Sequence, residues 1–162
     1  MAKNPDPSLT LTTSRGVART VDDWTTMFQL CLVVLPARSE ASAFIPVAQR
    51  IFATFGDSDA TCAYLVTGEA EVARRILGKV EAEEMTFVDP DGALVASLGI
   101  QRLPALVQIR QDTSVGATAE GWNARDWQRA VREIAKAMAW TVPEVSGAGD
   151  PPRGLDWPVA TV

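Results

Sequence analysis

The most informative absence in this 162-residue chain is histidine, of which it has none. Without an imidazole there is no Ser-His-Asp or Cys-His activation of a nucleophile, and no histidine-ligated zinc, copper or haem. Cysteine is scarce as well, because Cys31 and Cys62 are the only two. Two thiolates cannot by themselves complete a four-cysteine zinc site or an iron–sulfur centre. We therefore expect no metal and no cofactor, and any chemistry must use carboxylates, lysine, Tyr64 or a single thiol.

Basic residues and long apolar runs are also few. The chain has 15 Lys and Arg residues against 20 Asp and Glu residues, a formal net charge of −5. General nucleic-acid binding needs a basic face, so we expect no nucleic-acid partner. No apolar run approaches the roughly 20 residues of a membrane span, and the polar start Met1–Ser8 is unlike a signal peptide. These features predict a cytoplasmic protein without a membrane partner, in which both thiols are reduced.

Length and composition fit one globular domain. The chain is 47% hydrophobic and 22% charged, which is ordinary for a soluble domain. We expect a flexible arm over residues 1–8, a folded domain over residues 9–141 and a tail over residues 142–162. The tail is rich in proline and glycine and lacks the apolar residues of a core, so it is expected to be extended or disordered.

Hydrophobic periodicity predicts the order of the elements. Leu30–Leu35 is apolar on both faces, as a central parallel strand must be. Residues 39–55 have the spacing of an amphipathic helix, which Pro46 is expected to kink. A hairpin over residues 105–119 and a long helix capped by Asn123 end the domain. The order β-α-β-α-β-α, then β-β-α, predicts parallel strands with antiparallel strands added to the same sheet.

Three local matches make this succession resemble the thioredoxin-like superfamily. The stretch Phe87–Val107 is similar to the family's third strand, short helix and cis-proline segment, with Pro104 as the cis-proline after Leu103. Gly121 and the capped helix after it resemble the family's C-terminal hairpin and helix, and Pro46 is placed like the family's kinking proline. The resemblance implies an α/β fold of three layers, α/β/α, with a mixed sheet and a cis-proline. The Pro/Gly-rich C-terminal tail has no counterpart in it.

The chain departs from the family where its redox members carry Cys-x-x-Cys. Those cysteines lie at a helix N-terminus, which lowers the thiol pKa and favours the thiolate. Here the same place reads Pro36-Ala-Arg-Ser-Glu-Ala-Ser42, with Arg38 and Ala41 at the two cysteine positions. The two cysteines of the chain instead fall within neighbouring strands, where they are expected to pack as small hydrophobic residues. The dithiol cycle of the family is therefore absent.

The family's peptide groove beside the cis-proline does not depend on cysteine, because an extended peptide pairs there with backbone groups. By resemblance, the candidate partner-binding residues are Arg38, Ser39, Glu40, Ser42, Arg102, Leu103, Pro104 and Trp122. The arginines offer charge, the serines and Glu40 offer hydrogen bonds, and Trp122 is expected to be partly exposed. A simpler alternative is that Ser39 and Glu40 only cap and complement the helix and Pro104 only shapes the sheet edge.

These residues favour a non-redox thioredoxin-like domain that binds a protein or peptide client, as a chaperone-type module does. Short stretches resemble the thioredoxin-like hydrogenase-maturation chaperones, which also lack Cys-x-x-Cys: Asp22–Trp24, Leu98–Ile100, Leu103–Leu106 and Gly121–Trp122. The alternative from another class is a thiol-dependent oxidoreductase or peroxidase relative that uses a single cysteine, Cys31 or Cys62. A glutathione-type ligand site is a third reading, although the helical second domain of the transferases is absent.

The tail carries one further pattern. In Leu155-Asp-Trp-Pro-Val159 the apolar residues alternate, as in an extended segment laid on a surface. One hypothesis is that this segment docks over the groove, on its own domain or on a sister subunit of a homodimer. The other is that the tail is disordered.

Overall fold

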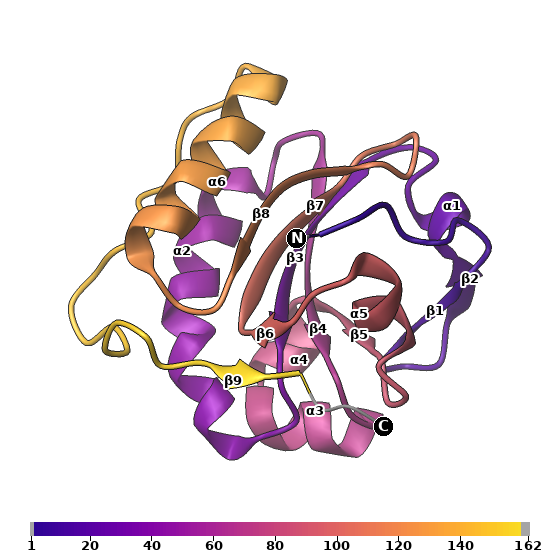
Figure 1. The fold of residues 1–162 in the computed structure, drawn as a ribbon, viewed down its shortest axis with the longest axis horizontal. Helices are drawn as coiled ribbons and strands as arrows, with labels where there is room; N and C mark the ends of the chain where they lie inside the picture. Colours follow the sequence, from indigo (N-terminus) through magenta and orange to yellow (C-terminus); the bar gives the residue numbers. More distant parts are fainter. Residues whose placement is uncertain (1, 160–162) are drawn as a thin grey trace.

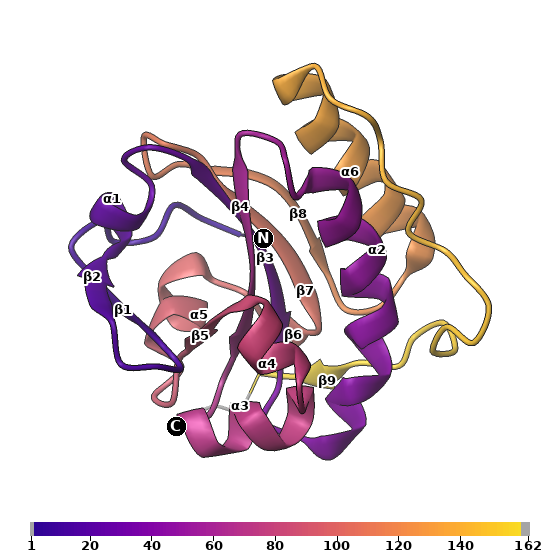
Figure 2. The ribbon, with the colours of Figure 1, turned by 180° about the vertical axis from the view of Figure 1, so that it is seen from behind.

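The computed structural model describes residues 2–159; Met1 and residues 160–162, the ends of the predicted arm and tail, lie outside the described residues. A seven-stranded mixed sheet has the strand order β2-β1-β5-β4-β3-β7-β8, and helices cover both of its faces (Figures 1 and 2). β3 (Gln29–Leu35), β4 (Ala60–Val66) and β5 (Met85–Val88) are parallel neighbours, and β7 (Ala105–Ile109) joins β3 antiparallel. The predicted three-layer α/β/α fold with a mixed sheet is confirmed.

The other elements complete the sheet and its covering layers. β8 (Val115–Glu120) forms one end of the sheet, and β1 (Thr10–Thr13) with β2 (Ala18–Thr20) forms the other. The helices are α1 (Val21–Trp24), the 3-10 helix η1 (Ser39–Phe44), α2 (Ile45–Phe55), α3 (Ala70–Leu77), α4 (Val80–Glu83), α5 (Ala93–Leu98) and α6 (Ala124–Met138). A separate two-stranded pair is formed by β6 (Arg102–Leu103) and β9 (Trp157–Pro158). In residues 2–159 no helix has both the length and the apolarity needed to cross a bilayer.

β3 lies at the centre of the molecule because both of its faces are covered. Every residue of Leu30–Leu35 is 0% exposed. Alternate side chains of the strand pack on one side with α2, α3 and α6, and on the other side with α5 and Leu11. The apolar run in the sequence therefore corresponds to a strand enclosed by two separate cores.

The helical segment after β3 is divided near a proline. Residues 39–55, expected as one kinked helix, form η1 followed by α2, and Pro46 lies in the first turn of α2. A proline in a first turn gives up an N–H that has no partner within the helix, and its fixed φ suits a helix start. Pro46 is thus the second residue of α2, at the junction with η1, and not a residue inside one continuous α-helix over residues 39–55 as the sequence predicts.

The N-terminal residues, expected as a flexible arm, lie against α5. The backbone N–H of Lys3 donates to the Leu98 carbonyl at 2.8 Å. The backbone N–H of Asp6 donates to the Ser97 hydroxyl, also at 2.8 Å. Further hydrogen bonds run from the Val115 N–H to Asn4 Oδ1 and from the Asp22 N–H to the Pro7 carbonyl. The described part of the expected flexible arm is therefore hydrogen-bonded to the domain.

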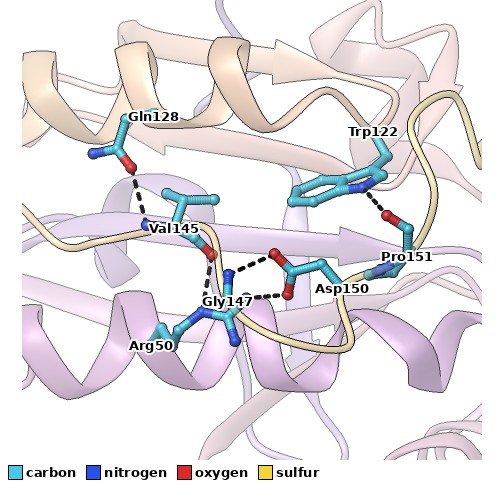
Figure 3. Close-up of polar contacts among 7 residues, drawn as sticks. All are labelled: Arg50, Trp122, Gln128, Val145, Gly147, Asp150 and Pro151. Carbon is cyan, nitrogen blue, oxygen red and sulfur yellow. Dashed lines mark hydrogen bonds and ion pairs between the residues drawn. The ribbon is translucent and has the colours of Figure 1, made fainter.

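The C-terminal segment 142–159 is also laid on the domain, as Figures 1 and 2 show for its path past α6 and α2. Val145 is 0% exposed and belongs to the core between these helices. Its N–H donates to Gln128 Oε1 at 3.0 Å, and its carbonyl accepts from Arg50 Nε at 2.9 Å (Figure 3). Arg50 also forms an ion pair with Asp150. Although this segment has the Pro- and Gly-rich composition of a linker, it is docked on the domain, because one buried apolar side chain and several polar contacts hold it there.

Val145→Ala tests this docking. The substitution removes buried methyl groups and leaves a cavity, so it should lower the free energy of unfolding by about 2 kcal/mol in a urea titration. Val142→Ala is the matched control in the same segment, because Val142 is 44% exposed. Its effect should stay within about 0.5 kcal/mol. Equal effects of the two substitutions would contradict the docked position of the segment.

Candidate functional site

The candidate site is the edge of β6, which follows α5 and leads into the buried strand β7. The peptide bond between Leu103 and Pro104 is cis. The Pro104 carbonyl accepts a hydrogen bond from the Gly121 N–H at 2.8 Å, which ties this edge to the end of β8. The side chain of Leu103 is buried, whereas that of Arg102 is 48% exposed. The edge therefore presents a short strand and one arginine on its outer side.

The tail of the same chain occupies this edge. β9 pairs with β6 in antiparallel orientation, with Trp157 opposite Leu103 (Figure 1). The ladder continues beyond the two strands, since the N–H of Val159 donates to the Gln101 carbonyl at 2.8 Å. An extended segment that adds to an exposed strand in this way is the geometry of β-augmentation.

A carboxylate next to β9 is held by two donors from the domain. Arg102 Nε donates to Asp156 Oδ1 at 2.6 Å, and the Trp122 N–H donates to Asp156 Oδ2 at 3.3 Å. A Cβ atom at Gly121 would come within 2.6 Å of Asp156 Oδ2, and φ of Gly121 is +74°. Glycine is therefore favoured here both by its backbone conformation and by the approach of the carboxylate.

The indole of Trp157 lies between a cation and an aromatic ring. The Arg38 guanidinium carbon is 5.0 Å from the centroid of the indole. The ring of Phe44 meets the same indole edge to face, with 6.3 Å between centroids. Cation–π and edge-to-face contacts of this kind favour an aromatic residue over an aliphatic one at this place.

Trp122, expected to be partly exposed, is only 3% exposed. Its ring packs edge to face against Phe44 and Trp127, with centroid distances of 5.6 and 5.3 Å. The tail covers it further, because Trp122 Nε1 donates to the Pro151 carbonyl at 2.9 Å (Figure 3). The expectation was wrong because it took no account of the docked tail. Trp122 serves the edge through its backbone N–H, and its ring supports Phe44.

The segment before α2 contributes one of its four predicted residues to the edge. Arg38 reaches Trp157, and its Nε also donates to Glu40 Oε2 at 3.0 Å, which lowers the pKa of that carboxyl group. Ser39 and Ser42 line a different groove, against α3. No side-chain hydrogen bond caps the start of η1. The structure therefore brings Arg38 to Arg102 and Leu103, and leaves both serines apart from them.

A cavity of about 270 Å³ lies beside β9. The carboxyl ends of the parallel strands β3, β4 and β5 lead into it, which is the usual place for ligands in α/β sheets. Its walls come from the domain and from the tail: Pro36, Ala37, Arg38, Thr67, Pro90, Asp91, Gly92, Val95, Leu103, Trp157, Pro158 and Val159. In the described part of the chain, no three Cys, Asp or Glu side chains gather as a metal site would require.

The two cysteines lie away from this edge. Cys31 and Cys62 are register partners in β3 and β4; Cys31 is buried, and Cys62 keeps part of its surface exposed. A hydrogen bond with Cys62 and burial raise the pKa of the Cys31 thiol. Cys31 is the third residue of β3, whereas the edge lies past Leu35, roughly 13 Å along the strand at about 3.3 Å per residue.

Three residues that the structure brings to the site, Phe44, Asp156 and Trp157, are absent from the predicted set of partner-binding residues. Asp156 lies within the segment Leu155–Val159 that the alternation singles out, so its place directly before a tryptophan was the available signal. Phe44 belongs to the apolar face of the segment before α2, where nothing in the sequence separates a core residue from a site residue. Asp156 belongs to the tail itself and reaches the edge through Arg102, and Phe44 becomes a site residue only through contact with Trp157 of the tail.

No protein-family model and no curated protein sequence matches this chain, but solved structures do. A protein named as a thiol:disulfide interchange protein DsbE from Chlorobium tepidum gives a TM-score of 0.69 at 17% identity, over 85% of this chain and 98% of that one. The thioredoxin domain of a thiol-disulfide oxidoreductase from Bacteroides vulgatus gives 0.63 at 14% identity, over 83% and 98%. Peroxiredoxin Q from Xanthomonas campestris gives 0.64 at 14% identity, over 82% and 92%. At such identities the likeness establishes the fold: this chain has the thioredoxin-like α/β fold.

Proposed function

We propose that this protein binds an extended segment of a partner protein at the β6 edge, without dithiol redox chemistry. The observation that supports it is the β6–β9 pair, in which the edge already accepts an extended strand together with a carboxylate and an aromatic ring. Backbone pairing of this type supplies affinity, and the side-chain contacts supply selectivity. At the two cysteine positions of redox relatives, Arg38 supplies a cation to the edge and Ala41 is a buried methyl group.

A chaperone-type role in the cytoplasm is part of this proposal, because an incompletely folded client exposes extended segments that such an edge fits. A homodimer held by exchanged tails is not part of it, since β9 reaches β6 of its own chain. A closer relation to the hydrogenase-maturation chaperones rests on short sequence matches alone. The solved structures named above do not support that relation.

Thiol-dependent redox chemistry is the second candidate function, and the similarity to thiol-disulfide oxidoreductases and peroxiredoxin Q favours it. Cys62 is the accessible thiol, in a cavity that it shares with Phe28, Phe52 and Glu84. The described residues that line this cavity include no lysine or arginine, so no cation there favours a thiolate. The geometry of the thiols therefore supports this candidate less than the fold likeness does.

Arg102→Glu tests the binding proposal. The substitution removes a charge-assisted hydrogen-bond donor from the edge and puts a negative charge where the acidic residue of a partner would bind. The amount of such a partner retained by the protein should therefore fall at least about tenfold. The measurement is affinity capture with tagged full-length protein and quantitative mass spectrometry of the retained proteins. Arg129→Glu on the exposed face of α6 is the matched control and should retain the partner. The same retained proteins for wild type and Arg102→Glu would contradict binding at this edge.

Thiol labelling of the native protein separates the two candidates. In Cys62→Ala the remaining thiol, Cys31, loses its hydrogen bond with Cys62 but stays buried, and burial still raises its pKa. At pH 7 it should therefore react with a disulfide reagent at least about a hundredfold more slowly than free cysteine. Its rate should increase with pH, and unfolding in urea should abolish the protection. The Cys31→Ala protein reports on Cys62 in the same assay. Reaction of either thiol faster than free glutathione at pH 7 would favour the redox candidate over the binding proposal.

A further inference from the structure

We infer that β9 is a built-in competitor at the β6 edge, and that the partner segment carries the same recognition chemistry: an acidic residue directly followed by an aromatic residue, in an extended strand. The inference deepens the proposed function and rests on it. It assigns to the tail the role of an occupant that a partner must displace. It also assigns to the partner the side chains that the edge is built to receive.

The acidic position is specified by donors of the domain. The Asp156 carboxylate is 17% exposed, and its two oxygens accept from the Arg102 guanidinium and from the backbone N–H of Trp122. Gly121 leaves space for one of these oxygens where any other residue would place a Cβ atom. An arginine beside a backbone N–H is a carboxylate receptor, because both groups donate and neither can accept. A partner with a neutral amide in this place would lose the charge-assisted bond.

The next residue of the ligand is specified by the surroundings of Trp157. The Arg38 guanidinium and the Phe44 ring both contact the indole; Arg38 immediately precedes η1, and Phe44 is the last residue of η1. An aliphatic side chain would forfeit the cation–π contact and the edge-to-face contact together. Pairing with β6 fixes the spacing of the two positions, because Trp157 lies opposite Leu103 in the ladder.

The two halves of the tail are attached very differently. The first half is anchored by the buried Val145 and by the Arg50–Asp150 ion pair (Figure 3). The second half has a strand of only two residues, and the arginine of its ion pair is about half exposed. Exposed ion pairs contribute little to stability, and short, partly exposed pairings open first. Residues 155–159 can therefore leave the edge while the first half stays docked.

The turn between the halves is suited to such an opening. Gly154 is exposed and has φ of +84°, and a Cβ atom there would meet nothing within 4 Å, so no side-chain packing fixes the turn at this residue. Its N–H donates to the Trp122 carbonyl at 3.0 Å, which places the turn directly before the competing segment. A hinge needs only a few residues whose φ and ψ angles can change, and the turn at Gly154 provides such a place.

A fluorescent peptide with the sequence of residues 154–159, Gly-Leu-Asp-Trp-Pro-Val, tests the inference by anisotropy with the full-length protein. We expect the variant Asp156→Asn/Trp157→Ala, whose own tail competes poorly, to bind the peptide at least about tenfold more tightly than wild type does. The reason is that apparent affinity scales with the fraction of protein whose edge is open. Equal affinities, or no binding to either protein, would overturn the inference.

Matched substitutions in the peptide and in the protein test which side chains the edge recognises. Peptides with Asp replaced by Asn, or Trp by Ala, should bind the tail-released variant at least about tenfold more weakly than the parent peptide does. Adding Arg102→Gln to the tail-released variant should remove the preference for Asp over Asn, whereas Arg129→Gln should keep it. Urea unfolding verifies that each variant is folded. Asp156→Asn alone, which preserves the size of the side chain, replaces the double variant if the latter does not fold.

The outcomes separate this inference from the proposed function. If the peptide fails to bind the tail-released variant while Arg102→Glu still loses a partner in the capture experiment, the inference is wrong and the proposed function stands. If the peptide binds as expected but capture is unchanged by Arg102→Glu, the edge receives only the tail of its own chain. That second result would overturn both the proposed function and the assignment of a partner to this site.

Discussion

Burial of β3 on both faces is the constraint on which the rest of the structure depends. A strand with six fully buried residues must be paired on both edges and covered on both sides, because its backbone and side chains have no access to water. β4 pairs with one edge of β3 in parallel orientation, and β7 pairs with the other edge in antiparallel orientation. The helices on either side of the sheet cover the two faces of the strand. The segments that enter and leave the carboxyl end of this sheet are then brought together, and the candidate site is formed from them.

At that end lies the strand edge of β6, paired with β9. The guanidinium of Arg38 lies over the indole of Trp157 there, and the resemblance to the superfamily implies that Arg38 is at the position of the first cysteine of Cys-x-x-Cys. The cysteines that the chain does have lie inside the sheet, and the pKa of the Cys31 thiol is raised. The groups gathered at the edge are thus a cation, a backbone N–H and an aromatic ring, and under the proposed function they would serve recognition rather than electron transfer.

Sequence reasoning succeeded where the signal is local. The apolar run Leu30–Leu35 predicts a doubly covered strand, and Asn123 is the helix cap expected, accepting from the N–H groups of Arg125 and Asp126. The resemblance to the thioredoxin-like superfamily implied the three-layer α/β/α fold with a mixed sheet and a cis peptide bond before Pro104, and the structure has both. These features depend on periodicity and capping within a few residues, which a single sequence contains.

The contacts that define the site could not be predicted in this way. Arg102 and Asp156 are 54 residues apart in the chain, and no pattern in the residues around either one indicates that the two side chains form an ion pair. Trp122 was expected to be partly exposed because the cover that the tail gives it is invisible without the structure. The tail has the composition of a linker, and a single valine in it, Val145, enters the core. Such a segment is docked by tertiary contacts that leave no periodic pattern.

The anchored first half of the tail has a further consequence, which concerns local concentration. Because Asp150 holds the chain only a few residues before Asp156, a released β9 remains tethered beside its own binding edge. Short flexible tethers give effective concentrations on the order of millimolar. Under the proposed function, a partner in free solution would have to overcome that concentration by higher affinity, or by several contacts made at once. The edge is thereby shielded from weak extended peptides and from the edge strands of other chains, which would otherwise add to it.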